Sequence, residues 1–231
     1  MARPSPPSPP PTAAPVTANP LIGAVFVGDT DQHTCTGSVL HSQTGDLILT
    51  AAHCLAGGSY AAFVPGFSGD AGPAGRWKIG SVYMDPRWLS TQDPIADFAV
   101  ARVSSAGAAS VESVVGRGLA LGTAPPKGTL VTVTAYPASV GGTPIGCRGD
   151  TATGPRGFPS LSCAGLPAGT SGAPWVSGSS VVGLIGGFHG GGCNDDVSYS
   201  PPFDGAVSAL VGRAEADGPG DTGPTTFNDG C

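Results

Sequence analysis

Hydrophobic residues along this chain come in short runs, and each run is bounded by Gly, Pro, Ser, Asn or Asp. The runs are rich in Val, Ile, Leu and Thr, which favour strands, whereas the bounding residues favour turns. The strands expected from the runs cover 21–27, 36–40, 46–50, 76–84, 97–103, 129–136, 160–165, 173–178 and 180–188. Many short strands at regular spacing predict an all-β fold, either a sandwich or a pair of barrels.

Helices are expected to contribute little. The chain has 38 glycines and 24 prolines, and both residues destabilise helix interiors. Only 204–216 has helical spacing of its apolar residues, and 104–126 is rich in small residues, which indicates a connection between two halves. The expected organisation is a proline-rich disordered arm over 1–20, β units over 21–112 and 113–216, and a loose tail over 217–231.

Composition excludes several partners. The formal net charge is −6 with only ten Lys plus Arg, which argues against nucleic acid or an anionic membrane. No apolar stretch approaches the roughly 20 residues that a membrane span requires. Residues 1–20 contain eight prolines and no apolar signal region, so we expect either a longer precursor or an export route that does not use such a region.

The six cysteines are Cys35, Cys54, Cys147, Cys163, Cys193 and Cys231. Their number is even, and no pair has the close C-x-x-C spacing of zinc ribbons or redox motifs. Disulfides formed in an oxidising compartment are therefore expected, which predicts export from the cytosol.

Three stretches together predict a catalytic serine. His53 lies in "LTAAHC", Asp97 in "DPIADFAV" and Ser171 in "GTSGAP". A serine hydroxyl becomes nucleophilic when an imidazole takes its proton, and a buried carboxylate then fixes the imidazole tautomer. Gly169 and Gly172 permit a tight turn, so that the N–H groups of Gly169 and Ser171 can form an oxyanion hole.

The chain order His, Asp, Ser excludes an α/β-hydrolase. That fold runs Ser, Asp or Glu, then His, and carries the motif G-x-S-x-G. Here Ala173 occupies the last position of the motif, and no βαβ pattern surrounds the serine.

"TAAHC", "DFAV" and "GTSGAP" together resemble the trypsin/chymotrypsin-like serine peptidases over roughly residues 21–213. "DFAV" is similar to that family's D-I-A-L, and "GTSGAP" to its G-D-S-G-G-P. The resemblance implies two six-stranded antiparallel β-barrels with a short C-terminal helix, and a triad of His53, Asp97 and Ser171 in the cleft between the barrels. It also implies a Cys35–Cys54 bridge, because "CTGSV" is similar to the family's C-G-G-S-L.

Two departures narrow the resemblance. Thr170 stands where animal digestive members carry an aspartate that pairs with a new N-terminal amine, so activation by that ion pair is not expected. "TAYP" at 134–137 is similar to an element of the bacterial secreted branch related to glutamyl endopeptidases. Ile185 stands where those peptidases carry a histidine in the S1 pocket, so the resemblance does not support glutamate specificity.

The resemblance also bears on substrate binding. Gly165 occupies the position where trypsins hold an aspartate, so Arg or Lys specificity has no evident anchor. Gly186 and Gly187 are expected to form the edge that pairs with the substrate backbone.

The remaining cysteines have expected roles. Cys147 and Cys163 flank one loop just before the nucleophile, and a bridge between them would stiffen the wall of the specificity pocket. Cys193–Cys231 would then tie down the tail, although Cys231 can alternatively be free or bond another chain.

Three histidines lie outside the proposed triad. His33 and His41 lie beside polar turn residues, and we expect them at the solvated surface. His189 is expected in a glycine-rich loop rather than in the pocket. His189 and Cys193 lack further ligands at suitable spacing, so neither a metal nor another cofactor is expected.

The sequence therefore predicts a secreted, monomeric serine endopeptidase that acts on proteins or peptides. The alternative is a catalytically silent homologue that serves as a binding or adhesion module, tethered by its proline-rich arm. The intact triad favours the enzyme.

Overall fold

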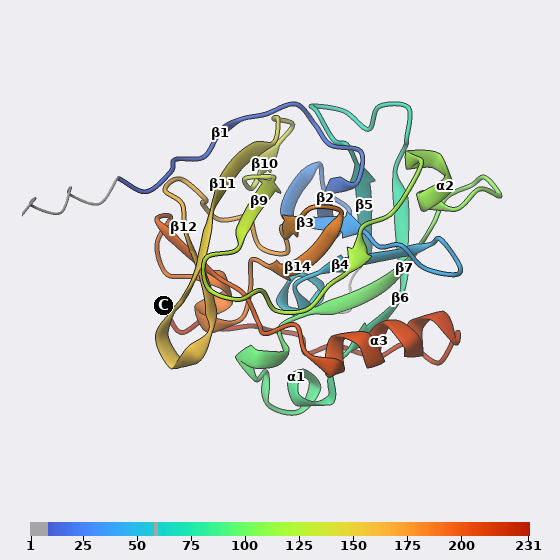
Figure 1. Cartoon of the computed structure of the whole chain (residues 1–231). Helices are drawn as coiled ribbons and strands as arrows, with labels where there is room; N and C mark the ends of the chain where they lie inside the picture. Colours follow the sequence, from blue (N-terminus) through green and yellow to red (C-terminus); the bar gives the residue numbers. More distant parts are fainter. Residues whose placement is uncertain (1–8, 58–59) are drawn as a thin grey trace, which may run out of the picture.

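The first half of the chain forms a closed barrel in the computed structural model, which describes residues 9–57 and 60–231 (Figure 1). Its six strands are β2 (Ile22–Val27), β3 (Gln32–Val39), β4 (Leu47–Thr50), β5 (Ala61–Pro65), β6 (Trp77–Met84) and β7 (Ala99–Ser104). They pair in the order β3-β2-β5-β6-β7-β4, and β4 pairs again with β3. This closure leaves no free edge within the ring.

The second half forms a curled half-barrel. Its main strands are β9 (Leu130–Ala135), β11 (Ile145–Thr153), β12 (Pro159–Ser162), β13 (Pro174–Ser177), β14 (Ser180–Leu184) and β15 (Val197–Tyr199). Three short strands extend the two sheets: β1 (Ala14–Pro15) beside β11, β8 (Ala120–Leu121) beside β14, and β10 (Ser139–Val140) beside β3.

The expected second six-stranded barrel is therefore not closed by a strand ladder. The sheet runs β15-β12-β11-β9-β13-β14-β8, with β14 and β15 far apart in the order. Single hydrogen bonds bridge the gap instead: Gly186 N–H donates to the Tyr199 carbonyl, and Leu184 N–H donates to Ser200 Oγ. The chain leaves the strand conformation after Leu184, which prevents a continuous ladder.

The expected C-terminal helix is present as α3 (Gly205–Glu215). The Asp204 carboxylate caps it by accepting from Ala206 N–H at 2.9 Å. Val207, Leu210 and Ala214 are its buried residues, and their spacing of three and four places them on one face. Figure 1 shows α3 crossing below β6 and β7 of the first barrel.

Two further helices were not expected from the sequence. α1 (Pro86–Thr91) begins with Asp85 as its cap and a proline in its first turn, and α2 (Val111–Val115) begins with Ser110 as its cap and ends at the left-handed Gly116. Pro and Ser near these positions predicted turns, but the same residue types also occur at the starts of helices.

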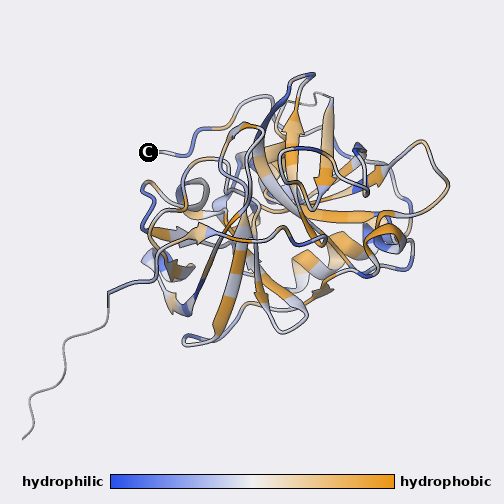
Figure 2. Cartoon of the chain, turned by 90° about the horizontal axis from the view of Figure 1, so that it is seen from above, coloured by the Kyte–Doolittle hydropathy of each residue, from blue (hydrophilic) through white to orange (hydrophobic). Residues whose placement is uncertain are grey.

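Four short 3₁₀ turns complete the described elements: η1 (Ala52–Leu55), η2 (Pro94–Ala96), η3 (Pro155–Gly157) and η4 (Phe188–Gly191). Hydrophobic residues, orange in Figure 2, gather on the strands of both sheets, and the buried ones form two apolar clusters. Trp77, Phe63 and Phe98 belong to the cluster in the barrel, and Trp175 and Leu161 belong to the cluster in the half-barrel.

The proline-rich arm differs from the expected disordered tether along its described part. β1 pairs with β11, and Ala13 N–H donates to the Ala164 carbonyl at 2.7 Å. Ala164 N–H in turn donates to the Pro11 carbonyl. Extended prolines leave their carbonyls free to accept, so this segment lies along the half-barrel as an added edge. Residues 1–8 lie outside the described part.

The tail over 217–231 is not loose, and we call it the strap. It lies along the first barrel, where Asp221 N–H donates to the Val82 carbonyl and the Asp221 carboxylate accepts from Met84 N–H. Asp221 also pairs with Arg213 of α3. The strap then reaches the second half of the chain, where Cys231 is bonded to Cys193. Backbone hydrogen bonding, which composition does not reveal, orders this segment.

The structure contains the three expected disulfides, which are Cys35–Cys54, Cys147–Cys163 and Cys193–Cys231. The described residues include no free cysteine. Among the described helices, none has both the length and the apolar character to cross a membrane.

His33 is buried, contrary to its expected place at the surface. Its ring makes edge contacts with Phe26, Phe67 and Tyr136, and its Nε2 lies 2.8 Å from the Gly141 carbonyl. Burial among these rings also raises the pKa of the Tyr136 hydroxyl above its usual range. His41 has a 69% exposed side chain, as expected.

Candidate active site

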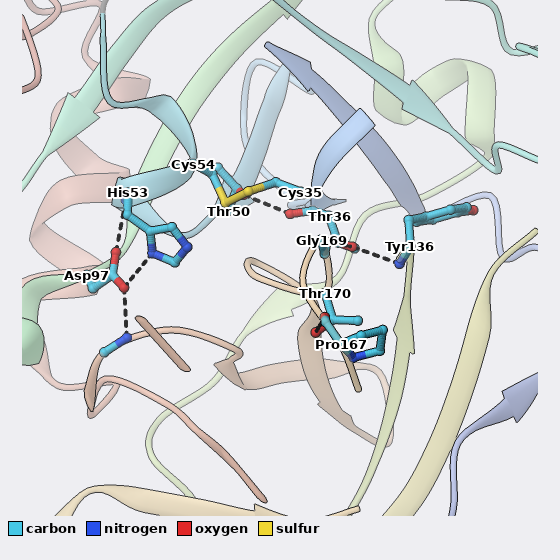
Figure 3. Close-up of a disulfide and its surroundings, with 11 residues drawn as sticks. Cys35, Thr36, Thr50, His53, Cys54, Asp97, Tyr136, Pro167, Gly169 and Thr170 are labelled. Atoms are coloured by element: carbon cyan, nitrogen blue, oxygen red, sulfur yellow. Dashed lines mark hydrogen bonds and ion pairs between the residues drawn. A yellow bond between two sulfur atoms is a disulfide. The ribbon is translucent and has the colours of Figure 1, made fainter. Parts of the chain in front are cut away.

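His53 and Asp97 form a tight pair at the edge of the first barrel (Figure 3). His53 lies on η1, directly after β4, and Asp97 lies between η2 and β7. The His53 Nδ1–H donates to Asp97 Oδ2 at 2.8 Å, and the His53 backbone N–H donates to Oδ1 at 3.0 Å. Because Nδ1 carries the proton in the neutral imidazole, Nε2 is left as an acceptor.

Asp97 is fully buried, and N–H donors satisfy its charge. A third donor, the N–H of Gly187, reaches Oδ2 at 2.8 Å. The neighbouring Gly186 is also constrained, because a Cβ at that position would lie 3.1 Å from Asp97 Oδ2. Gly186 and Gly187, which were expected to pair with the substrate backbone, therefore lie against the Asp97 carboxylate.

Ser171 lies on a turn that requires glycines on both sides. Gly169 has a φ of 94°, and a Cβ there would lie 2.0 Å from Ala138 N. Gly172 has a φ of 80°, and a Cβ there would lie 2.2 Å from the Thr36 carbonyl oxygen. Only glycine combines these dihedral angles with such close approach.

The backbone of this turn presents two unengaged donors. The N–H groups of Thr170, Gly172 and Ala173 all donate to carbonyls of the chain. In the described part of the chain, by contrast, the N–H groups of Gly169 and Ser171 donate no hydrogen bond. These two groups are the expected oxyanion donors.

Thr36 links the two halves at this turn and was missed by sequence reasoning (Figure 3). Its N–H donates to the Ser171 carbonyl at 2.8 Å, and its hydroxyl donates to the Gly169 carbonyl at 3.2 Å. The same hydroxyl accepts from Tyr136 N–H, and the Thr36 carbonyl accepts from Thr50 Oγ1. A threonine beside a strand cysteine carries no sequence signal of such a contact.

Thr170 is buried, and its hydroxyl donates to the Pro167 carbonyl at 2.8 Å. A neutral hydroxyl thus stands at position 170, where the animal digestive peptidases carry an aspartate. The turn is held by this local bond and by the bonds of Thr36.

A cavity of about 430 Å³ joins these groups. Its lining includes His53, Ser171, Ile185 and the segments 166–170 and 189–195. Ser171 is half-buried and His53 is 11% exposed, so both side chains are accessible from it. No hydrogen bond between Ser171 Oγ and His53 is formed among the described residues; such bonds often tighten only with substrate bound.

Of the four expected substrate-binding residues, one lines the cavity and three do not. Ile185 lines the cavity, whereas Gly165 is exposed and lies outside its lining. Gly186 and Gly187 follow the end of β14, where the Gly187 N–H is engaged with Asp97.

His189 belongs to the cavity lining as well as to a glycine-rich turn, so its expected place outside the pocket is corrected. Its Nδ1–H donates to the Asp229 carbonyl at 2.9 Å. His189 forms a ligand-like group with Cys193 and Cys231, and His53 forms one with Cys35 and Cys54. Both cysteine pairs are disulfides, which offer no thiolate to a metal.

The fold and this site define a serine-type peptidase of the chymotrypsin-like class. The family model of the trypsin-like peptidase domain matches residues 35–184. The chain belongs to that family. A search of curated proteins by sequence finds no match.

Solved structures support the fold assignment. The protease Anisep from Arthrobacter nicotinovorans has a TM-score of 0.76 at 23% identity, over 89% of this chain and 100% of that chain. The thermostable serine protease AL20 from an extremophilic microorganism has a TM-score of 0.73 at 22% identity, over 86% of this chain and 98% of that chain. A Glu endopeptidase has a TM-score of 0.72 at 17% identity, over 89% and 97%. At these identities the likeness concerns the fold.

Proposed function

We propose that this chain is a secreted serine endopeptidase that hydrolyses peptide bonds through Ser171, His53 and Asp97. The observation that carries the proposal is the shared cavity. There, His53, which is hydrogen-bonded to a buried carboxylate, lines the same cavity as Ser171 and Gly169, whose backbone N–H groups are unengaged within the described chain.

The residues divide the reaction as follows. Ser171 Oγ attacks the scissile carbonyl carbon while His53 Nε2 takes its proton, and the oxyanion is held by the N–H groups of Gly169 and Ser171. The imidazolium then gives the proton to the leaving amine, and an acyl-enzyme on Ser171 remains. Water, deprotonated by His53, attacks the ester carbonyl carbon. The imidazolium then returns this proton to Ser171 Oγ as the ester bond breaks and the acid leaves. Asp97 holds the Nδ1–H tautomer and stabilises the imidazolium throughout.

Secretion is supported by the three disulfides, which persist in oxidising compartments. An extended polypeptide is the substrate class that suits an open cavity lined by residues of both the barrel and the half-barrel. The alternative, a silent binding module, is favoured by one comparison: human heparin binding protein has a TM-score of 0.69 at 16% identity. The intact His53–Asp97 pair argues for the enzyme.

The test is labelling with a fluorophosphonate probe, which reacts with an activated serine. We expect the wild-type protein to label, the Ser171→Ala variant to remain unlabelled, and the matched Ser179→Ala variant, altered at an exposed turn, to label like the wild type. A folded wild-type protein that does not label would contradict the proposal. Equal labelling of Ser171→Ala would contradict the assignment of Ser171.

A further inference from the structure

The ring of Phe227, from the strap, lies against the ring of His53. The two ring centroids are 4.8 Å apart and the planes differ by 16°, so the rings are stacked. Phe227 is half-buried and lines the same cavity as His53 and Ser171. One face of the imidazole is therefore covered by a side chain that lies 174 residues away in sequence.

The surroundings of Phe227 are shaped to receive it. On the side of the first barrel its ring packs against Trp88 of α1, with centroids 5.4 Å apart, and Trp88 is itself buried. In the cavity lining, a Cβ at position 190 would lie 3.1 Å from Phe227 Cε1, so Gly190 leaves the space that the ring fills.

The strap is anchored on both sides of Phe227. Before it, Gln92 Nε2 donates to the Thr226 carbonyl. After it, the Asp229 carbonyl accepts from His189 Nδ1, and Cys231 is bonded to Cys193. The ring is therefore held from the first barrel and from the wall of the cavity, on a segment that bridges the two.

We propose that Phe227 is a positioning residue for His53, and that it also determines which substrate side chains fit against the imidazole. The inference rests on the proposed function. Asp97 holds the imidazole along one edge, through Nδ1, and this contact leaves the ring free to tilt. A parallel ring on one face restricts that tilt and keeps Nε2 directed at the cavity. The same ring occupies space in which a bulky substrate side chain would otherwise lie.

The test compares Phe227→Ala, Phe227→Leu and Phe227→Tyr with the matched variant Thr225→Ala, which alters an exposed position of the strap. Active enzyme is first counted by fluorophosphonate labelling, and kcat and KM are then measured on a peptide library varied one position at a time. An aromatic stack contributes about 0.5–1.5 kcal/mol, which corresponds to roughly two- to tenfold in rate.

We expect Phe227→Ala and Phe227→Leu to lower kcat by that factor per labelled site, and Phe227→Tyr and Thr225→Ala to retain it. We also expect Phe227→Ala to accept bulkier side chains at one substrate position while the profile at other positions is unchanged. If Phe227→Ala does not fold, the contrast between Leu and Tyr decides the question.

The inference is overturned if the Leu variant keeps the wild-type kcat, or if Tyr falls as far as Leu. It is also overturned if no position of the substrate profile changes in the folded variants with a shortened side chain. Failure of the wild-type protein to label is a different outcome, because it would contradict the proposed function itself.

Discussion

The N–H of Thr36 donates to the carbonyl of Ser171 at 2.8 Å, so a strand of the first barrel holds the backbone of the nucleophile in the second half. The Thr36 hydroxyl adds a bond to the Gly169 carbonyl and accepts from Tyr136 N–H. The Gly169–Thr170 and Ser171–Gly172 peptide groups, which directly follow the two residues with the expected oxyanion donors, are thus fixed by one residue of the first barrel. The orientation of the expected oxyanion donors depends on this junction.

Replacing Thr36 by Val keeps the shape of the side chain and removes its hydroxyl. The Gly169 carbonyl and the Tyr136 N–H then lose their buried partner, at a cost of about 1–3 kcal/mol for an unsatisfied group. We expect a lower unfolding midpoint in denaturant titration and a reduced kcat. Thr132→Val, at an exposed position of β9 that does not line the cavity, is the control. An unchanged kcat in Thr36→Val would show that the hydroxyl does not orient the turn.

Replacing Gly169 by Ala places a Cβ against Ala138 N at a backbone φ of 94°. The peptide must move to relieve the contact, which displaces an expected oxyanion donor. Loss of one such donor lowers kcat by roughly 10²–10³-fold. Gly178→Ala is the matched control, because its φ is also positive at 62° and its Cβ would meet nothing within 4 Å. Comparable kcat values for the two variants would contradict the role of Gly169.

Three N–H groups donate to the two carboxylate oxygens of Asp97, and replacing Asp97 by Asn turns one of these oxygens into an NH₂ group. The amide NH₂ then faces a donor, and the Nδ1–H tautomer of His53 is no longer favoured. We expect kcat to fall by about 10⁴-fold while the protein remains folded, as measured by initial rates and circular dichroism. Asp93→Asn serves as the control, since Asn preserves the capping of η2 by this position. A loss smaller than tenfold would argue that Asp97 is not the orienting carboxylate.

Asp85 links pH to the helix that supports Phe227. The Arg87 guanidinium donates to its carboxylate and holds the pKa of Asp85 below its ordinary value of about 3.8. Because the folded-state pKa is the lower one, the stabilisation is fully present above the unfolded value, and it is lost as pH falls through the folded value.

We therefore expect Asp85→Asn to lower the thermal unfolding midpoint at neutral pH, and the difference from the wild type to shrink as pH is lowered below about 3.8. This difference in midpoint is measured by thermal unfolding followed by circular dichroism from about pH 2 to about pH 7, a range that spans carboxyl titration. A difference that is constant over this range would contradict an ionic contribution of Asp85.

Local patterns predicted most of the strands, and short motifs supplied the candidate triad residues. The runs that become β2, β4, β6, β7 and β9 are rich in apolar, β-branched or aromatic residues, so neighbouring residues alone indicate them. β5 has only "AAFVP" and β15 only "VSY", and both depend on partner strands for their conformation. α1 and α2 were not expected, because the residues that begin them, Asp85 with Pro86 and Ser110, are equally typical of turns.

The sequence by itself determined the all-β class, the three candidate triad residues in their motifs and the cysteines available for pairing. Each of these rests on residue type and short-range order. Only the tertiary structure decided that the second sheet stays open, that Thr36 fixes the nucleophile turn, and that the strap brings Phe227 onto His53. These contacts join residues far apart in the chain. Backbone hydrogen bonds and a ring stack make them, and neither depends on a local pattern of residue types.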